Sequence, residues 1–402
     1  MKKIFIQLFV LIPLLLLQQA KAQNCTTNAD LENVPGKYLT AAEYPWPAVR
    51  AEYFKNIPFA ADKALAKKTL EKIELIEKQS HANFNLTGAN WENVFVTRGY
   101  GYLASSKVGI YNFESWLHEF FCLNGKLKRN DEAGTILRIY INSLSLNTLN
   151  RFLSQPFGSS MGDYDFGLQF SDWKNHKPAD ANAQLITLFN YMTCNNNTLI
   201  DAINSGDKYF QDVADKDIKL NSRSTYITRY WFIQKKNTPV LVSVSRKEYL
   251  ESLLEYYERE KLYFPKLLAE LKGSSSAKQY STWEADVADK IAVVKKTMSE
   301  NSPDWLMKPA IINRGEDAAQ TYKAGLKERT NYNRFWKFYD GINKSEPLYK
   351  YNPDYFKSST TTFARPQIIT VAFRYVTMPV SLRILDNFTK TFDFNAIRNL
   401  LE

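Results

Sequence analysis

The chain is poor in histidine and cysteine, with three of each among its 402 residues. So few histidines limit the metal sites and general bases that it can assemble, and three cysteines cannot form a dense disulfide framework. It also has no compact run of lysine and arginine, although its formal net charge is +10. We therefore do not expect nucleic acid as a partner.

The N-terminus has the pattern of a secretory signal peptide over residues 1–22. Two lysines precede an apolar run over 4–17, and small residues then offer a cleavage site after Ala22. The run is shorter than the ~20 apolar residues of a membrane-spanning helix. Cys25 lacks the small residue directly before it that a lipidated cysteine needs. These features predict a secreted or periplasmic protein whose mature chain has no transmembrane segment.

Residue patterns along the rest of the chain predict an α+β fold with mixed, mostly antiparallel sheets. Asn124-Gly125 is typical of a tight hairpin, because both central residues of that turn need positive φ. A second hairpin is predicted from 226–234 and 240–244. The other strands, rich in β-branched and aromatic residues, are predicted at 94–96, 107–113, 119–123, 126–129, 135–141 and 367–375.

Apolar residues at helical spacing predict helices near 60–79, 183–192, 198–204 and 379–401, the last with a break near Asp393. Ser245 and Glu248 have the spacing of a capping box at the start of the strongest helix. A long antiparallel helical hairpin is therefore predicted over about 246–300.

Composition divides the mature chain into three regions. These are an N-terminal α+β region over 23–205, a strand hairpin with the helical hairpin over 206–302, and an aromatic-rich region over 303–402. The last region is predicted to be loop-like apart from one strand and the C-terminal helix. The three regions are also compatible with a single domain.

The cysteines allow one disulfide in an oxidising compartment. We predict a Cys122–Cys194 bond, because both residues lie in segments with regular structure while Cys25 is close to a frayed terminus. The alternative is that the thiols stay reduced and buried.

The sequence Gly-Ser-Ser-Met-Gly around Ser160 matches the nucleophile elbow of serine hydrolases. It lacks the strand before and the helix after that this elbow requires, and His176 follows too closely. We therefore hold a secreted hydrolase as the alternative function, with Ser160, His176 and Asp172 as catalytic residues, or with the carboxylates of Asp163, Asp165 and Asp172.

His118-Glu119-x-x-Cys122 is similar to the zinc-protease signature. The segment is predicted to be a strand, where residues four apart are too distant to share one ion. We predict no metal ion and no other cofactor.

The leading functional candidate is the segment 332–357, in which aromatic residues alternate with cations. Its proposed binding residues are Trp336, Tyr339, Arg334 and Lys337, since aromatic faces beside cations suit sugar rings or a protein interface. The alternative is that these aromatics pack in the core. The prediction is a non-catalytic binding or structural component of the cell envelope, with an envelope glycan or protein as partner.

Four short segments carry a resemblance to other sequences. Residues 229–233, 239–250, 34–38 and 121–126 look similar to uncharacterised exported proteins of Bacteroidetes-type bacteria. The resemblance implies a bacterial envelope setting and assigns no activity to any residue.

Overall fold

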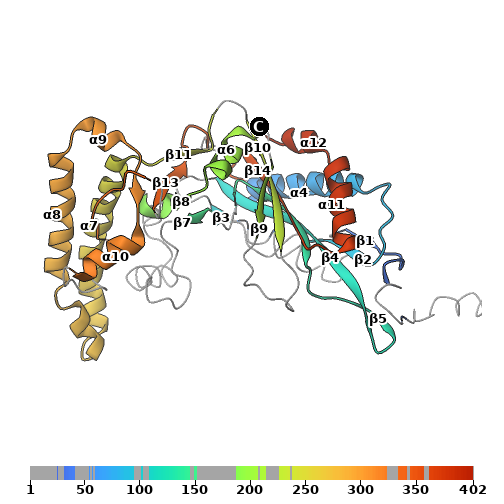
Figure 1. Cartoon of the computed structure of the whole chain (residues 1–402), viewed down its shortest axis with the longest axis horizontal. Coiled ribbons are helices and arrows are strands. Elements are labelled where there is room, and N and C mark those ends of the chain that lie inside the picture. The colour runs from blue at the N-terminus through green and yellow to red at the C-terminus, as the bar shows by residue number, and fades with distance from the viewer. Residues whose placement is uncertain are drawn as a thin grey trace, which may run out of the picture.

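The computed structural model contains two sheets and several helices, and its α+β class agrees with the prediction. The strands β1 and β2 pair in parallel, and the other strand pairs of the described residues are antiparallel. Figure 1 shows the helices α7 and α8 at one end of the molecule, away from the larger sheet. The structure describes residues 25, 31–40, 54, 57, 59–94, 101–102, 108–144, 149–151, 187–206, 209–213, 226–235, 238–323, 334–341, 345–356 and 362–401.

Among the described residues, the larger sheet has nine strands, and they come from all three predicted regions. Its order is β1 (Tyr38–Leu39), β2 (Ala89–Val94), β4 (Gly109–Leu123), β6 (Thr135–Ile141), β14 (Ile368–Tyr375), β10 (Ile227–Gln234) and β9 (Tyr209–Val213). The short strands β3 (Gly101–Tyr102) and β5 (Lys126–Arg129) pair with β4. The near-C-terminal strand β14 therefore lies between strands from the other two regions.

The strand β4 is one continuous element where two strands were predicted. Its polar middle stays extended because both β2 and β6 pair with it along that stretch. The turn into β5 is as predicted, with φ of 54° at Asn124 and 75° at Gly125. A side chain other than asparagine, aspartate or glycine would be strained at these two positions.

The smaller sheet contains β11 (Leu241–Ser243), β13 (Glu346–Tyr351), β8 (Tyr191–Thr193) and β7 (Asn150–Arg151), with β12 (Ile311–Ile312) beside β13. The predicted hairpin of 226–234 with 240–244 is wrong, because β10 pairs with β9 and β14 whereas β11 pairs with β13. The Asn204 side chain bonds both the N–H and the carbonyl of Leu241, at 2.9 and 3.0 Å. Each of the two strands therefore pairs with strands other than its neighbour in the predicted hairpin.

Helices α4 (Ala60–Ser80), α11 (Pro379–Thr391) and α12 (Phe394–Arg398) share one hydrophobic cluster with the larger sheet. Leu70 of α4 and Phe388 of α11 are buried there with Phe113 and Phe373 of the strands. The predicted break near Asp393 is confirmed, since its carboxylate accepts from the Ala396 N–H at 2.9 Å and caps α12.

Helices α7 (Arg246–Glu270) and α8 (Trp283–Glu300) contact each other, with a 3₁₀ turn η5 (Ser275–Tyr280) between them. The capping box is confirmed. The Glu248 N–H donates to Ser245 Oγ at 3.2 Å, and the Ser245 N–H donates to Glu248 Oε2 at 3.0 Å. Both groups would otherwise be unpaired at the helix start.

Two regions depart from the predicted elements. The helix expected near 183–192 is a 3₁₀ turn η4 (Thr187–Asn190) followed by β8, while α6 (Asn197–Ser205) forms as expected. The stretch after Pro303 is not loop-like, since it holds α9 (Pro303–Met307), β12, α10 (Arg314–Lys323) and β13. These elements are too short for periodicity to show them.

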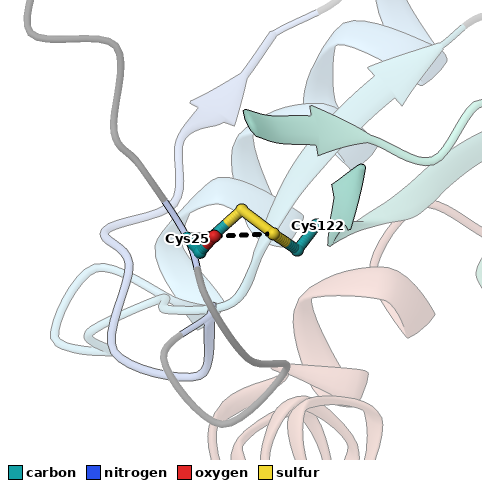
Figure 2. Close-up of a disulfide and its surroundings, with 2 residues drawn as sticks. All are labelled: Cys25 and Cys122. Carbon is teal, nitrogen blue, oxygen red and sulfur yellow. Dashed lines mark hydrogen bonds between the residues drawn. A yellow bond between two sulfur atoms is a disulfide. The ribbon is translucent and has the colours of Figure 1, made fainter. Parts of the chain in front are cut away.

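The disulfide joins Cys25 to Cys122, with 5.8 Å between their Cα atoms, so the predicted Cys122–Cys194 bond is wrong (Figure 2). Cys25 is buried beside the β4–β5 turn, and its N–H donates to the Gly125 carbonyl at 3.2 Å. It is therefore held in place and not frayed. Cys194 is a buried free thiol at the end of β8, and burial raises its pKa.

Candidate binding surface

Residues 334–341 cross the helical end of the molecule and are anchored to it. The Tyr339 N–H donates to the Ile311 carbonyl at 3.0 Å, and Phe335 is buried with 4% exposure. Phe335 lies 6.4 Å from the Tyr249 ring of α7 and 4.9 Å from the Phe338 ring. This segment, α9 and the start of α7 together are called the aromatic surface below.

A layered stack stiffens the aromatic surface. The Arg246 guanidinium lies 4.5 Å from the centre of the Trp305 ring and 5.2 Å from that of Phe338, and these two rings are 5.5 Å apart. Arg246 also donates from Nη2 to Asp340 at 3.1 Å. The stack combines cation–π attraction with an ion pair, so the loop is tied to the first turn of α7.

The four sequence-predicted binding residues lie together on this surface. Two of them face solvent, and the other two are held by acidic partners. Trp336 is 39% exposed, and Lys337 also faces solvent, with its Nζ 4.8 Å from the Tyr339 ring centre. Tyr339 is held by a 2.9 Å hydrogen bond from its hydroxyl to Asp317, and Arg334 by an ion pair with Asp289. Trp336 and Lys337 are therefore the two of these residues that face solvent.

The cations of the aromatic surface are balanced by acids. Arg246 is paired with Asp340, Arg334 with Asp289, and Lys337 with Glu316 at 3.1 Å. Burial raises the pKa of Asp317 to about 6, with a further increase from the nearby Glu316 carboxylate. Burial and the Asp317 carboxylate also raise the pKa of the Tyr339 hydroxyl. The Asp317 carboxyl therefore changes charge just below neutral pH.

We expect Asp317 to make stability fall as pH rises from about 4 to about 6. The folded state keeps this proton up to pH about 6, whereas an unfolded aspartate releases it near 3.8. The stabilisation that Asp317 provides is therefore fully present below the pKa of the unfolded state and is lost as the pH rises through the pKa of the folded state. The loss is roughly 1–2 kcal/mol after solvent screening. Denaturant unfolding of wild type and Asp317→Asn at several pH values measures it. A difference between the two proteins that does not vary with pH would contradict the expectation.

A hollow of about 350 Å³ adjoins the aromatic surface at the start of α7. Burial alone would raise the pKa of Glu248 there, but hydrogen bonds from Lys350 and Ser245 hold it below its usual value. An ionised Glu248 can accept hydrogen bonds but cannot act as a general acid. The lining includes Ser243, Ser245, Lys247, Glu248, Glu251 and Met307.

The residues of the alternative hydrolase lie outside the described residues, namely Ser160, Asp163, Asp165, Asp172 and His176. His118 and Cys122 lie on one strand, as predicted, and Cys122 is bonded to Cys25. Within the described ranges, no group of three His, Cys, Asp or Glu side chains could hold a metal ion.

Sequence reasoning missed two members of the surface, Trp305 and Arg246. Arg246 directly follows the capping Ser245, and Trp305 follows Pro303, so both have local signals for helix starts. Neither signal indicates that a guanidinium and an indole from separate helices would meet. Only tertiary packing brings them to residues 334–341.

The chain matches no protein family model, no curated protein and no solved structure. In the part of the chain that the structure describes, no helix combines the length and the apolarity that crossing a bilayer requires.

Proposed function

We propose that this chain is an exported, non-catalytic binding protein of the bacterial cell envelope and that its aromatic surface binds a neutral glycan. The observation that carries the proposal is the contrast between Phe335 and Trp336. Phe335 is buried at 4%, whereas the next residue presents an indole that is 39% exposed. A partly exposed tryptophan on an anchored segment offers a flat apolar face together with an N–H donor, which suits a sugar ring.

Anchoring of the surrounding residues supports high affinity at this surface. Tyr339, Arg334 and Arg246 each have a fixed partner before any ligand arrives. A preorganised site loses less conformational entropy on binding than a mobile loop would. The neighbouring hollow adds serine hydroxyls and the Glu248 carboxylate as hydrogen-bonding groups for sugar hydroxyls.

Charge balance favours a neutral glycan over an anionic one. Arg246, Arg334 and Lys337 each have an acidic partner, namely Asp340, Asp289 and Glu316. An anionic polymer would have to displace these acids or meet their repulsion. A ligand that stacks and forms hydrogen bonds meets neither cost.

The envelope setting is supported by three features. The sequence of residues 1–22 has the signal-peptide pattern, a disulfide is typical of oxidising compartments, and the resemblance to exported bacterial proteins points the same way. We also infer that α7 and α8 form the antiparallel hairpin expected from the sequence. The contacts of Glu260 with Lys290 and of Phe264 with Trp283 support it.

Trp336→Ala is expected to weaken binding of a neutral oligosaccharide about thirtyfold, which corresponds to about 2 kcal/mol for a central aromatic contact. The midpoint of thermal unfolding should change little, because Trp336 is 39% exposed and belongs to none of the hydrophobic clusters. Calorimetric titration with α- and β-linked glucan, mannan and xylan oligosaccharides measures the affinity.

Two variants serve as controls for this experiment. Tyr209→Ala removes another exposed aromatic, 54% exposed, at the edge of the larger sheet, and should leave binding intact. Phe335→Ala should lower stability. If Trp336→Ala unfolds the protein, or if wild type binds none of the oligosaccharides, the proposed function is wrong.

A further inference from the structure

The face of the larger sheet opposite α4 carries charged residues in the middle of its central strands. Side chains alternate along a strand, so Glu114 of β4 lies opposite to the buried Phe113 and Ser115. Glu114 is directly across from Arg138 of β6. Arg374 of β14 is across from Ile136, which lies two residues before Arg138 in β6. The register therefore brings one carboxylate and two arginines together.

Glu114 already accepts three hydrogen bonds from its neighbours. Its Oε1 accepts from Arg138 Nε at 3.0 Å and from Asn112 Nδ2 at 3.1 Å, and its Oε2 accepts from Trp116 Nε1 at 2.8 Å. One carboxylate with three donors compensates Arg138 but leaves little capacity for a second arginine.

Arg374 has no ion-pair partner among the described residues. Its Nη2 donates to the Ala133 carbonyl at 2.9 Å, and its guanidinium lies 4.9 Å from the Tyr226 ring centre. Its Nε is buried and has no hydrogen-bond partner, and none of the described carboxylates pairs with it. Burial lowers the pKa of Arg374, and repulsion from Arg138 lowers it further.

We propose that Arg374 and Arg138 form a binding site for a small oxyanion, a carboxylate or a phosphate group. A planar guanidinium matches the paired oxygens of either group, and an anion would supply the ion-pair partner that Arg374 lacks among the described residues. Solvent can reach the site, since the Arg138 side chain is 25% exposed and Arg374 is half-buried. Tyr226 forms an aromatic wall beside it.

This site is separate from the aromatic surface in both place and chemistry. Its residues belong to β4, β6 and β14 of the larger sheet, whereas the aromatic surface is built on α7 and α9. The cations of the aromatic surface are paired with acids, but Arg374 is not. The two proposals can therefore fail independently.

The test is calorimetric titration of the full chain with sodium phosphate and with sodium succinate, at constant ionic strength. Wild type should bind one of the two saturably, and the one that binds identifies the oxyanion. Arg374→Gln should weaken that binding at least tenfold, because the principal unpaired charge is removed. Fluorescence of Trp116, which donates to Glu114, gives an independent readout.

Arg383→Gln is the matched control, since it removes the same charge from α11, where Arg383 donates to Thr87. It should bind the anion as wild type does. Equal weakening in both variants, or no saturable binding by wild type, would overturn the proposal. If Arg374→Gln fails to fold, the titration is repeated with Arg374→Lys, which keeps the charge but loses the planar fork of the guanidinium. This variant should also bind the anion more weakly than wild type. Unchanged affinity in that variant would also exclude the site.

Discussion

Replacing Lys290 with methionine is expected to lower the free energy of unfolding by about 3–5 kcal/mol, the cost of removing one partner from a buried ion pair. Lys290 of α8 and Glu260 of α7 are both fully buried, and Nζ lies 3.1 and 3.0 Å from the two carboxylate oxygens. The ammonium is also 5.3 Å from the Tyr257 ring centre. Methionine would leave the Glu260 charge buried without the cation that neutralises it.

Denaturant unfolding of wild type and Lys290→Met measures this loss. The double variant Lys290→Met/Glu260→Leu should recover most of the stability, because it removes both charges from the apolar interface. Lys296→Met is a control on the same helix, where the exposed pair with Glu300 at 3.8 Å should contribute less than about 0.5 kcal/mol. A Lys290→Met protein as stable as Lys296→Met would show that the buried pair is unimportant.

Removing the disulfide with Cys122→Ser is expected to cost about 4 kcal/mol. The bond closes a loop with a sequence separation of 97, and a loop of that length strongly restricts the unfolded chain. In the folded state it ties Cys25 to the end of β4 beside the β4–β5 turn (Figure 2). Thermal and denaturant unfolding with and without a reductant measure the effect.

The cysteine variants also distinguish the observed pairing from the one predicted by sequence. Reductant should destabilise wild type and Cys194→Ala, and should have no further effect on Cys122→Ser. A Cys194→Ala protein that no longer responds to reductant would instead indicate a Cys122–Cys194 bond. The comparison is internal to each variant, so any packing cost of changing the buried Cys194 cancels.

Features that depend on neighbours in the chain were predictable. The Asn124-Gly125 turn, the Ser245/Glu248 capping box and the break at Asp393 each formed where the sequence indicated. Their physics is local, since a positive φ or an unpaired helix N–H is satisfied within three residues. Composition alone also marked the segment that contains Trp336 and Lys337, and their binding role stays a prediction.

Features that depend on distant partners were not predictable. The strands β10 and β11 do not pair with each other. The strand β14 offers β10 a longer partner, and β13 is the better-placed partner for β11. Cys25 found Cys122 because the Gly125 carbonyl holds its backbone beside the turn. The solvent exposure of Trp336 and the stacking of Arg246 on Trp305 also required the packed helices.

The sequence by itself determined the α+β class, the positions of α4, α7, α8 and β14, and the signal-peptide pattern, because periodicity and local turn chemistry encode them. Tertiary structure alone decided which strands pair, which cysteines bond, and which aromatic residues face solvent. It also decided that Arg374 has no acidic partner among the described residues while Lys337 has one. These outcomes depend on contacts between residues far apart in the chain, and hydrophobic burial, which drives those contacts, is not directional.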